Sequence, residues 1–144
     1  VLTNSAEKSV NLSFVNSPDF ETKSSYSINV RVSDGSLSDS QDVTVSINDI
    51  NDESPIFTSL SSFSVNENQT AVGSIAATDA DAGDSILYTI TGGADSDSFK
   101  ITSENGLLEF KTASDFETQS SFSLEITATD TADNFTKQTR HSFL

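Results

Sequence analysis

Carboxylate and amide side chains crowd one short segment of the chain. The segment reads Asp49-Ile50-Asn51-Asp52-Glu53-Ser54-Pro55, and four of its seven residues carry the side-chain oxygens of Asp, Asn or Glu. Pro55 favours extended backbone before it, as expected of a connection between two folded parts. Calcium takes about six to eight oxygen ligands, which such side chains supply. A solvated acidic linker would have the same composition, so this segment alone does not decide between them.

Further acidic motifs stand where this segment could meet them after folding. Asp79-Ala80-Asp81 with Gly83-Asp84 follows a predicted strand, and Asp130 ends a long strand. Asp19 and Glu21 precede the segment. A lone Asp-x-Asp is usually a solvated turn, but the motifs together predict a site for a hard cation.

The composition narrows the classes of function. Asp and Glu number 22 against 7 Lys and Arg, which gives a formal net charge of −15. Such a chain repels nucleic acid phosphates, so we expect no nucleic acid partner. There is no Cys, hence no disulfide framework and no thiolate metal site. For an extracellular domain without Cys, the remaining way to link distant segments is a hard cation bound by oxygen ligands.

Catalysis is not expected. His141 is the single histidine, and a lone histidine without Cys or a placed Ser partner is more often a surface residue than a base. Paired carboxylates could mimic a glycosidase pair, but here they stand at metal-ligand spacing. We therefore predict that the chain is not an enzyme.

The chain repeats itself. Asp19-Phe20-Glu21-Thr22 recurs as Asp115-Phe116-Glu117-Thr118, an offset of 96 residues. The alternating apolar pattern of Tyr26–Val32 lies over that of Phe122–Ala128 at the same offset. Self-similarity over a long period predicts tandem domains of about that size.

Period-two alternation of apolar residues predicts β-strands with one buried face. The candidates are Tyr26–Val32, Val43–Ile47, Phe63–Val65, Val72–Ala77, Leu87–Ile90, Phe99–Ile101, Leu108–Phe110 and Phe122–Ala128. Gly-containing turns at 82–84, 92–95 and 104–106 separate them, and no segment has a sustained helical period. The pattern predicts an all-β fold, a Greek-key β-sandwich of about seven strands.

In combination these motifs resemble the cadherin repeat. The family has a D-x-N-D-x-x-P linker, a D-x-E motif, a D-x-D loop and an x-E-N motif near the first strand, the last here Asn66-Glu67-Asn68. The resemblance implies an immunoglobulin-like sandwich for residues 56–144 and a calcium-binding linker at 51–55. Residues 1–50 would be the C-terminal half of a preceding repeat, whose first strands would lie before Val1.

The resemblance also implies a ligand set, because three calcium ions sit at each junction of consecutive cadherin repeats. Side chains would bind from Asp19, Glu21, Asp49, Asn51, Asp52, Asp79, Asp81 and Asp130, and backbone carbonyls from Ile50, Glu53 and Asp84. A bridging glutamate of the upper repeat would lie before Val1. Glu67, Asp115 and Glu117 would form a half-site of the next junction.

The function that the resemblance implies is that of a calcium-binding adhesion or structural module at the cell surface, in which calcium stiffens a tandem array. The expected partners are calcium, neighbouring repeats of the same protein and a homophilic or heterophilic protein partner. Two alternatives stay open: a calcium-dependent carbohydrate-binding β-sandwich, with a polysaccharide as partner, and a passive spacer of a large surface protein. The Cys-free, Ser/Thr-rich and acidic character favours a bacterial surface protein.

Overall fold

The computed structural model describes residues 9–83, 85–131 and 138–143. The chain divides into two units, Val1–Asn48 and Asp49–Leu144. The regular structure of the described residues is β, apart from one turn of 3-10 helix, η1 (Ser96–Ser98). The all-β prediction is therefore confirmed. Within the described residues, no helix has the length and apolar character needed to cross a membrane.

The first unit contains one antiparallel hairpin, β1 (Ser25–Ser33) and β2 (Ser38–Ser46). Asp34 closes its turn, because its Oδ1 accepts hydrogen bonds from the backbone N–H groups of Ser36 (2.9 Å) and Leu37 (2.8 Å). These bonds, the one from Leu37 first, lower the pKa of the Asp34 carboxyl. The Ser33 hydroxyl also bonds within this turn, accepting from the Gly35 N–H and donating to the Leu37 carbonyl, so local side chains set the turn.

The alternation of β1 gives this hairpin one apolar face. The face carries Tyr26, Ile28, Val30 and Val32, with Val43 and Val45 of β2 opposite Ile28 and Tyr26. Val30 is 37% exposed and Val32 61% exposed. The alternation is thus that of a strand with one buried face, but the described residues of this unit do not cover the part of the face at Val30 and Val32.

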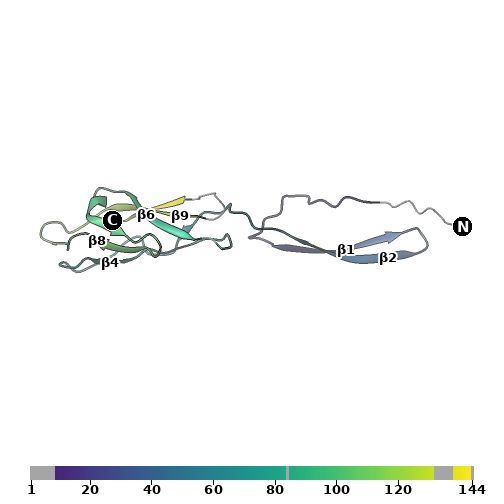
Figure 1. The fold of residues 1–144 in the computed structure, drawn as a ribbon, viewed down its shortest axis with the longest axis horizontal. Helices are drawn as coiled ribbons and strands as arrows, with labels where there is room; N and C mark the ends of the chain where they lie inside the picture. Colours follow the sequence, from purple (N-terminus) through teal and green to yellow (C-terminus); the bar gives the residue numbers. More distant parts are fainter. Residues whose placement is uncertain (1–8, 84, 132–137, 144) are drawn as a thin grey trace. The chain divides into compact units, whose positions relative to one another are not determined.

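The second unit is a sandwich of short antiparallel sheets. One layer has the order β10-β9-β6, from β6 (Ile86–Gly92), β9 (Leu124–Asp130) and β10 (Gln138–Phe143). The other has the order β4-β8-β7, from β4 (Ala71–Ser74), β7 (Phe99–Ile101) and β8 (Leu107–Phe110). Figure 1 shows β6 and β9 in one layer and β4 and β8 in the other. A two-residue pair, β3 (Ile56–Phe57) and β5 (Ala77–Thr78), joins the sandwich at one end.

The core lies between the two layers, and β9 supplies its central row. Leu124, Ile126 and Ala128 alternate along β9 with exposed fractions of 3%, 0% and 0%. Facing residues from the other elements complete the cluster, namely Ile75, Tyr88, Phe99, Leu108 and Phe110. The next inward position of β9 is Asp130, which is fully buried. The strand that builds the core therefore also places a carboxylate at its end.

Two strand predictions differ from the structure. Phe63–Val65 forms no strand; Phe63 instead packs so closely over Gly73 that a Cβ there would lie 2.6 Å from its ring. The predicted strand Val72–Ala77 is divided, because β4 pairs with β8 whereas β5 pairs with β3. The described part of the second unit thus holds eight strand segments, β3 to β10, rather than seven strands.

The internal repeat is visible in local packing within each unit. In the first, Phe14 packs edge-on against Tyr26 with ring centroids 5.0 Å apart at 69°. In the second, Phe110 packs on Phe122 at 4.9 Å and 64°. Both pairs are related by the offset of 96 residues, so equivalent positions of the two units make the same contact.

Asp95 fastens the loop after β6 to the segment before β9. Its Oδ1 accepts a hydrogen bond from Gln119 Nε2 (2.8 Å) and its Oδ2 one from the Ser123 N–H (2.7 Å). These bonds, the one from Gln119 first, lower the pKa of the Asp95 carboxyl below its ordinary value of 3.8. The charged form of Asp95 is therefore favoured in the folded chain.

Truncating the centre of β9 tests the core assignment. Ile126→Ala should lower the free energy of unfolding of the second unit by about 2–5 kcal/mol, because it removes a fully buried side chain. Val30→Ala, at the equivalent position of the first unit, should lower it by less than about 1 kcal/mol. Urea denaturation followed by circular dichroism measures both, and equal losses would contradict the assignment.

The Asp95 contact should make stability depend on acid. Because its folded pKa lies below the unfolded value, the contact stabilises the fold above about pH 4, and this contribution disappears as the pH falls through the folded pKa. Asp95→Asn should therefore be less stable than the parent at pH 7, with the difference shrinking toward pH 2. Thermal unfolding across this range measures it. The control is Asp97→Asn at an exposed position of η1, and a gap that stays constant with pH would refute the prediction.

Candidate metal centre

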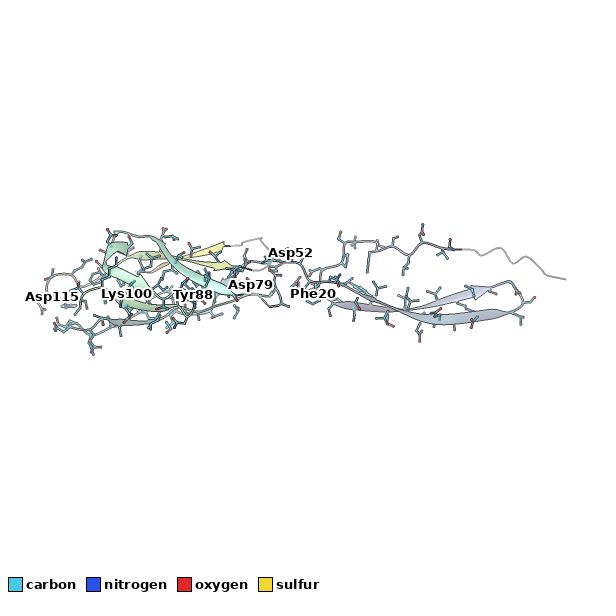
Figure 2. All side chains as sticks on the ribbon, in the orientation of Figure 1. Phe20, Asp52, Asp79, Tyr88, Lys100 and Asp115 are labelled. Carbon is cyan, nitrogen blue, oxygen red and sulfur yellow. The ribbon has the colours of Figure 1, made fainter. Side chains whose placement is uncertain are left out.

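The acidic segments of the second unit meet at one end of the sandwich. Asp49–Glu53 precedes β3, Asp79 and Asp81 follow β5, and Asp130 ends β9. Figure 2 shows Asp52 and Asp79 at this end of the second unit and Asp115 at the opposite end. The topology thus brings together three segments that are far apart in the sequence.

Backbone N–H groups hold one oxygen of each of three carboxylates. The Ala82 N–H donates to Asp49 Oδ2 at 2.7 Å. The Glu53 N–H donates to Asp81 Oδ2 at 2.9 Å, and the Asp81 N–H donates to Asp79 Oδ1 at 3.1 Å. These bonds tie the linker to the loop after β5 and fix the orientation of each carboxylate.

The second oxygen of each of these carboxylates is buried without a hydrogen-bond partner among the described residues. The atoms are Asp49 Oδ1, Asp79 Oδ2 and Asp81 Oδ1. A buried acceptor without a donor is costly, and a buried carboxylate more so. A cation supplies what these oxygens lack, so the donor set fits a metal ion.

Two more carboxylates add to the negative charge of this end. Asp130 is 0% exposed, and its Oδ1 accepts a hydrogen bond from Asn51 Nδ2. An oxygen of Asp52 lies within 4.8 Å of an oxygen of Asp81. Like charges about 4 Å apart repel by about 4 kcal/mol at an effective dielectric constant near 20. The cluster therefore favours the binding of positive charge.

The chemistry of the donors points to calcium. The group offers carboxylate oxygens and the Asn51 amide oxygen, and contains neither imidazole nor thiolate. Hard cations prefer such oxygens, and calcium accepts the irregular geometry that a set of mixed carboxylates provides. The residues present thus fit the ion that the resemblance implies.

The other predicted ligands stand as follows. The Ile50 side chain is 65% exposed, and its predicted role uses its carbonyl. Asp84 lies outside the described residues. Asp19 and Glu21 are exposed residues of the first unit, where Asp19 Oδ2 accepts a hydrogen bond from the Thr22 hydroxyl at 2.8 Å. This bond is the main cause that lowers the pKa of Asp19. The roles of all four residues stay predictions.

The predicted half-site at the opposite end does form a cluster. Oxygens of Glu67, Asp115 and Glu117 lie within 4.8 Å of one another, and all three residues are exposed. Glu67 Oε2 accepts from the Phe116 N–H at 3.2 Å, and Asp115 Oδ2 from the Thr118 hydroxyl at 2.8 Å. The Thr118 bond is the main cause that lowers the pKa of Asp115. Water can solvate this cluster, so it lacks the buried oxygens of the first.

Sequence reasoning missed the backbone donors of the centre. The Asp81 N–H bond to Asp79 follows from Asp-x-Asp spacing, because an Asp side chain often accepts from the N–H two residues on. Glu53 was predicted to act through its carbonyl, and the structure adds the donor role of its N–H. The Ala82 N–H has no signal in the sequence.

Comparison with known proteins places the chain in a family. A family model described as the cadherin domain matches residues 61–142. Human Cadherin-24 is 38% identical over 128 residues, covering 78% of this chain and 16% of the relative. Mouse Protocadherin Fat 4 is 36% identical over 121 residues, covering 78% of this chain and 2% of the relative. The chain thus spans a small part of the curated relatives that it matches.

Solved structures agree with these relatives. The structure titled "Protocadherin Gamma B2 extracellular cadherin domains 3-6" superposes with a TM-score of 0.78 and 27% identity, covering 87% of this chain and 32% of that one. "Protocadherin gammaB7 EC3-6 cis-dimer structure" has the same TM-score at 24% identity, covering 87% of this chain and 32% of that one, and shows a shared fold. The predicted immunoglobulin-like cadherin architecture is thereby confirmed. With its sequence, its fold and its relatives in agreement, this chain belongs to the cadherin family.

Proposed function

We propose that this chain is a calcium-binding module of an extracellular, cell-surface adhesion protein, and that calcium at the linker stiffens the connection between consecutive repeats. The observation that supports the proposal is the group of buried, unpartnered oxygens Asp49 Oδ1, Asp79 Oδ2 and Asp81 Oδ1. Membership of the cadherin family supports it further, because cadherins are adhesion proteins that typically bind calcium between repeats.

The proposed ligands fall into two groups: carboxylates that hydrogen bonds already orient, and residues that complete the set. Asp49, Asp79, Asp81 and Asp130 belong to the second unit, where backbone or amide donors already orient each carboxylate. Asn51 and Asp52, the carbonyls of Ile50, Glu53 and Asp84, and the side chains of Asp19 and Glu21 complete the proposed set. Bound calcium would supply positive charge to oxygens that the described residues leave without a donor.

The positive charge of the bound ion would change the flexibility of the linker. Pro55 is fully buried in the second unit, and the Glu53 N–H is bonded to Asp81. Asp49, at the start of the linker, is held by Ala82. These contacts keep the linker against the second unit, whereas the repulsion among its carboxylates opposes them. A cation removes the repulsion, and a flexible connection then becomes a stiff one.

Calcium suits this role better than magnesium does. Magnesium requires a nearly regular octahedron and releases its water reluctantly, whereas calcium accepts six to eight oxygens in varied geometry. The donors here are oriented by loop backbone rather than arranged in a regular figure. Extracellular modules of this kind bind calcium with Kd values of about 10⁻⁴ to 10⁻³ M.

The proposed partners are neighbouring repeats of the same protein and a homophilic or heterophilic protein partner. Sugar-binding platforms usually need exposed aromatic rings with a polar edge. The chain has no Trp. Tyr88 is 7% exposed, and its hydroxyl accepts a hydrogen bond from the Ala77 N–H. The proposal therefore does not extend to a polysaccharide.

Calcium-dependent aggregation of beads coated with the chain would separate an adhesive module from a passive spacer.

Removing one buried charge should have opposite effects with and without calcium. Asp81→Asn keeps an oxygen for the Glu53 N–H and removes one negative charge, so the metal-free chain should be stabilised by about 1 kcal/mol or more. The same change should abolish most of the rise in melting temperature on adding about 5 mM calcium. Thermal unfolding in calcium and in excess chelator measures both effects.

The matched control is Glu67→Gln, a charge removed from the exposed cluster at the other end. It should leave the calcium response nearly unchanged. If Asp81→Asn kept the full response, or if the parent chain showed none, the buried acidic centre would not be the calcium site.

The stiffening role makes a separate prediction. Small-angle X-ray scattering of the full chain should show a narrower range of conformations in calcium than in chelator, because the bound ion removes repulsion along the linker. Asp79→Ala with Asp81→Ala should scatter like the chelated parent under both conditions. Scattering curves that do not change with calcium would contradict stiffening even if calcium binds.

A further inference from the structure

Asn105 and Gly106 form the single Asn-Gly pair of the sequence, and they lie in the turn between β7 and β8. Asparagine is a thermolabile residue, because the backbone nitrogen of the next residue can attack its side-chain amide carbon. A glycine at the next position has no Cβ to hinder this attack. Asn105 is exposed, so water reaches its side chain. The pair is therefore a candidate site of covalent modification outside the calcium centre.

The modification needs no reagent other than water. The Gly106 nitrogen loses its proton to solvent base and forms a bond to Cγ of Asn105. The amide nitrogen of the side chain takes up a proton and leaves as ammonia, which closes a five-membered succinimide ring. Water then adds to one of the two ring carbonyl carbons and opens the ring. Opening on one side leaves aspartate, and opening on the other leaves isoaspartate, whose main chain runs through Cβ and Cγ.

Two hydrogen bonds of the turn act on this reaction in opposite directions. The Leu107 N–H donates to Asn105 Oδ1 at 3.1 Å, which draws charge away from the amide carbon and favours attack on it. The Gly106 N–H donates to the Thr102 carbonyl at 2.9 Å, which occupies the attacking nitrogen and holds its proton. The closed turn thus keeps the reactive pair together but blocks the first step, and the reaction has to wait until the bond to Thr102 opens.

The space around Gly106 does not fit the longer backbone of isoaspartate. Gly106 has a φ of +67°, and a Cβ placed on it would overlap the Ile75 carbonyl oxygen. The Ile75 N–H donates to the Gly106 carbonyl at 2.9 Å, and Ile75 is only 1% exposed. Isoaspartate inserts one more carbon into the main chain before Gly106, and a close-packed interior has no room for that displacement. A chain that forms isoaspartate at position 105 therefore loses contacts of the closed turn.

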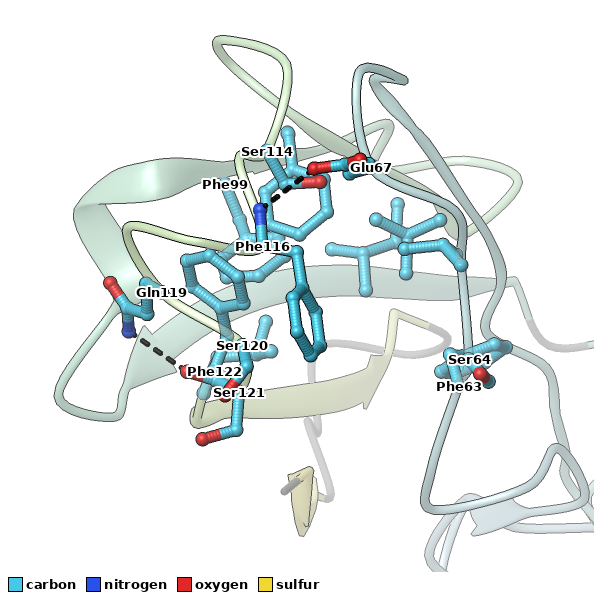
Figure 3. Close-up of a pocket in the computed structure, with 15 residues that line it drawn as sticks. Phe63, Ser64, Glu67, Phe99, Ser114, Phe116, Gln119, Ser120, Ser121 and Phe122 are labelled. Carbon is cyan, nitrogen blue, oxygen red and sulfur yellow. Dashed lines mark hydrogen bonds between the residues drawn. The ribbon is translucent and has the colours of Figure 1, made fainter.

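The strands on either side of the turn are short and border a cavity. β7 has three residues and β8 has four. Phe99 of β7 and Leu108 of β8 line a cavity of about 250 Å³, whose lining Figure 3 shows with Phe99 and Phe116 labelled. Atoms beside a cavity lack packing partners on one side, and segments with fewer packed contacts open at a lower free energy than the whole fold. We therefore expect this turn to open without unfolding of the whole unit.

We propose that Asn105 is a modification site that the fold controls. The closed turn suppresses succinimide formation, local opening permits it, and the isoaspartate product prevents the turn from closing as before. Conversion of Asn105 thus records how long the turn between β7 and β8 has been open. This inference rests on the turn alone and does not depend on the proposed calcium site.

The first test compares the folded full chain with the chain unfolded in urea, both at mildly alkaline pH and in saturating calcium. Peptide mapping by mass spectrometry measures the conversion, and isoaspartyl methyltransferase identifies isoaspartate. Asn105 should convert about tenfold or more slowly in the folded chain than in urea. Asn16-Ser17 is the internal control, because it is exposed and lies outside any strand or helix, and it should convert at nearly the same rate in both. Equal rates for Asn105 in the two states, or no conversion of Asn105 in urea, would overturn the proposal.

The second test asks whether isoaspartate fits the closed turn. Chains aged in urea are refolded, and those with isoaspartate at position 105 are separated by chromatography. Asn105→Asp is the matched control, because it carries the same added charge and keeps an oxygen for the Leu107 N–H, while its main chain has the parent length. The isoaspartate chain should have a lower melting temperature than Asn105→Asp, and its Ile75 amide should exchange about tenfold faster or more. If the two chains matched in both measurements, the turn would accommodate the product and the proposal would fail.

Discussion

Three buried carboxylate oxygens without hydrogen-bond donors among the described residues are the constraint on which the linker end of this repeat depends. Asp49, Asp79 and Asp81 each use one oxygen on a backbone N–H and bury the other without a partner among the described residues. Each of these backbone bonds orients its carboxylate. The fold therefore keeps carboxylate oxygens in a costly environment, and the proposed calcium site rests on this feature.

The same strand builds both the core and this constraint. Alternate residues of β9 face inward, namely Leu124, Ile126, Ala128 and then Asp130. The apolar row of the strand therefore continues directly into the acidic centre. A register shift of one residue would remove Asp130 from the centre and the aliphatic side chains from the core together. Hydrophobic packing thus fixes the position of Asp130, one of the proposed calcium ligands, within a cluster built from three distant segments.

Much of the fold could be predicted from the sequence, because alternation of apolar residues and the tandem repeat are both visible in the sequence itself. The strands around Tyr26–Val32 and Phe122–Ala128, the all-β class and the family follow from the sequence; the structure confirms the strands and the class, and the relatives confirm the family. The strand predicted at Phe63–Val65 does not form; Phe63 packs on Gly73 instead of pairing in a sheet. Contacts such as that of the Ala82 N–H with Asp49 depend on backbone placement after folding, which no residue type specifies.

The two acidic clusters of the second unit show why composition alone does not define a metal site. Glu67, Asp115 and Glu117 also form a carboxylate cluster, yet all three are exposed, and Asp115 accepts a hydrogen bond from the Thr118 hydroxyl. Water and local donors stabilise that cluster, so it gains less from a cation. At the linker end, burial removes the water while the backbone supplies only one donor to each of three carboxylates. Desolvation, rather than the number of carboxylates, is therefore what distinguishes the proposed calcium site from the exposed cluster.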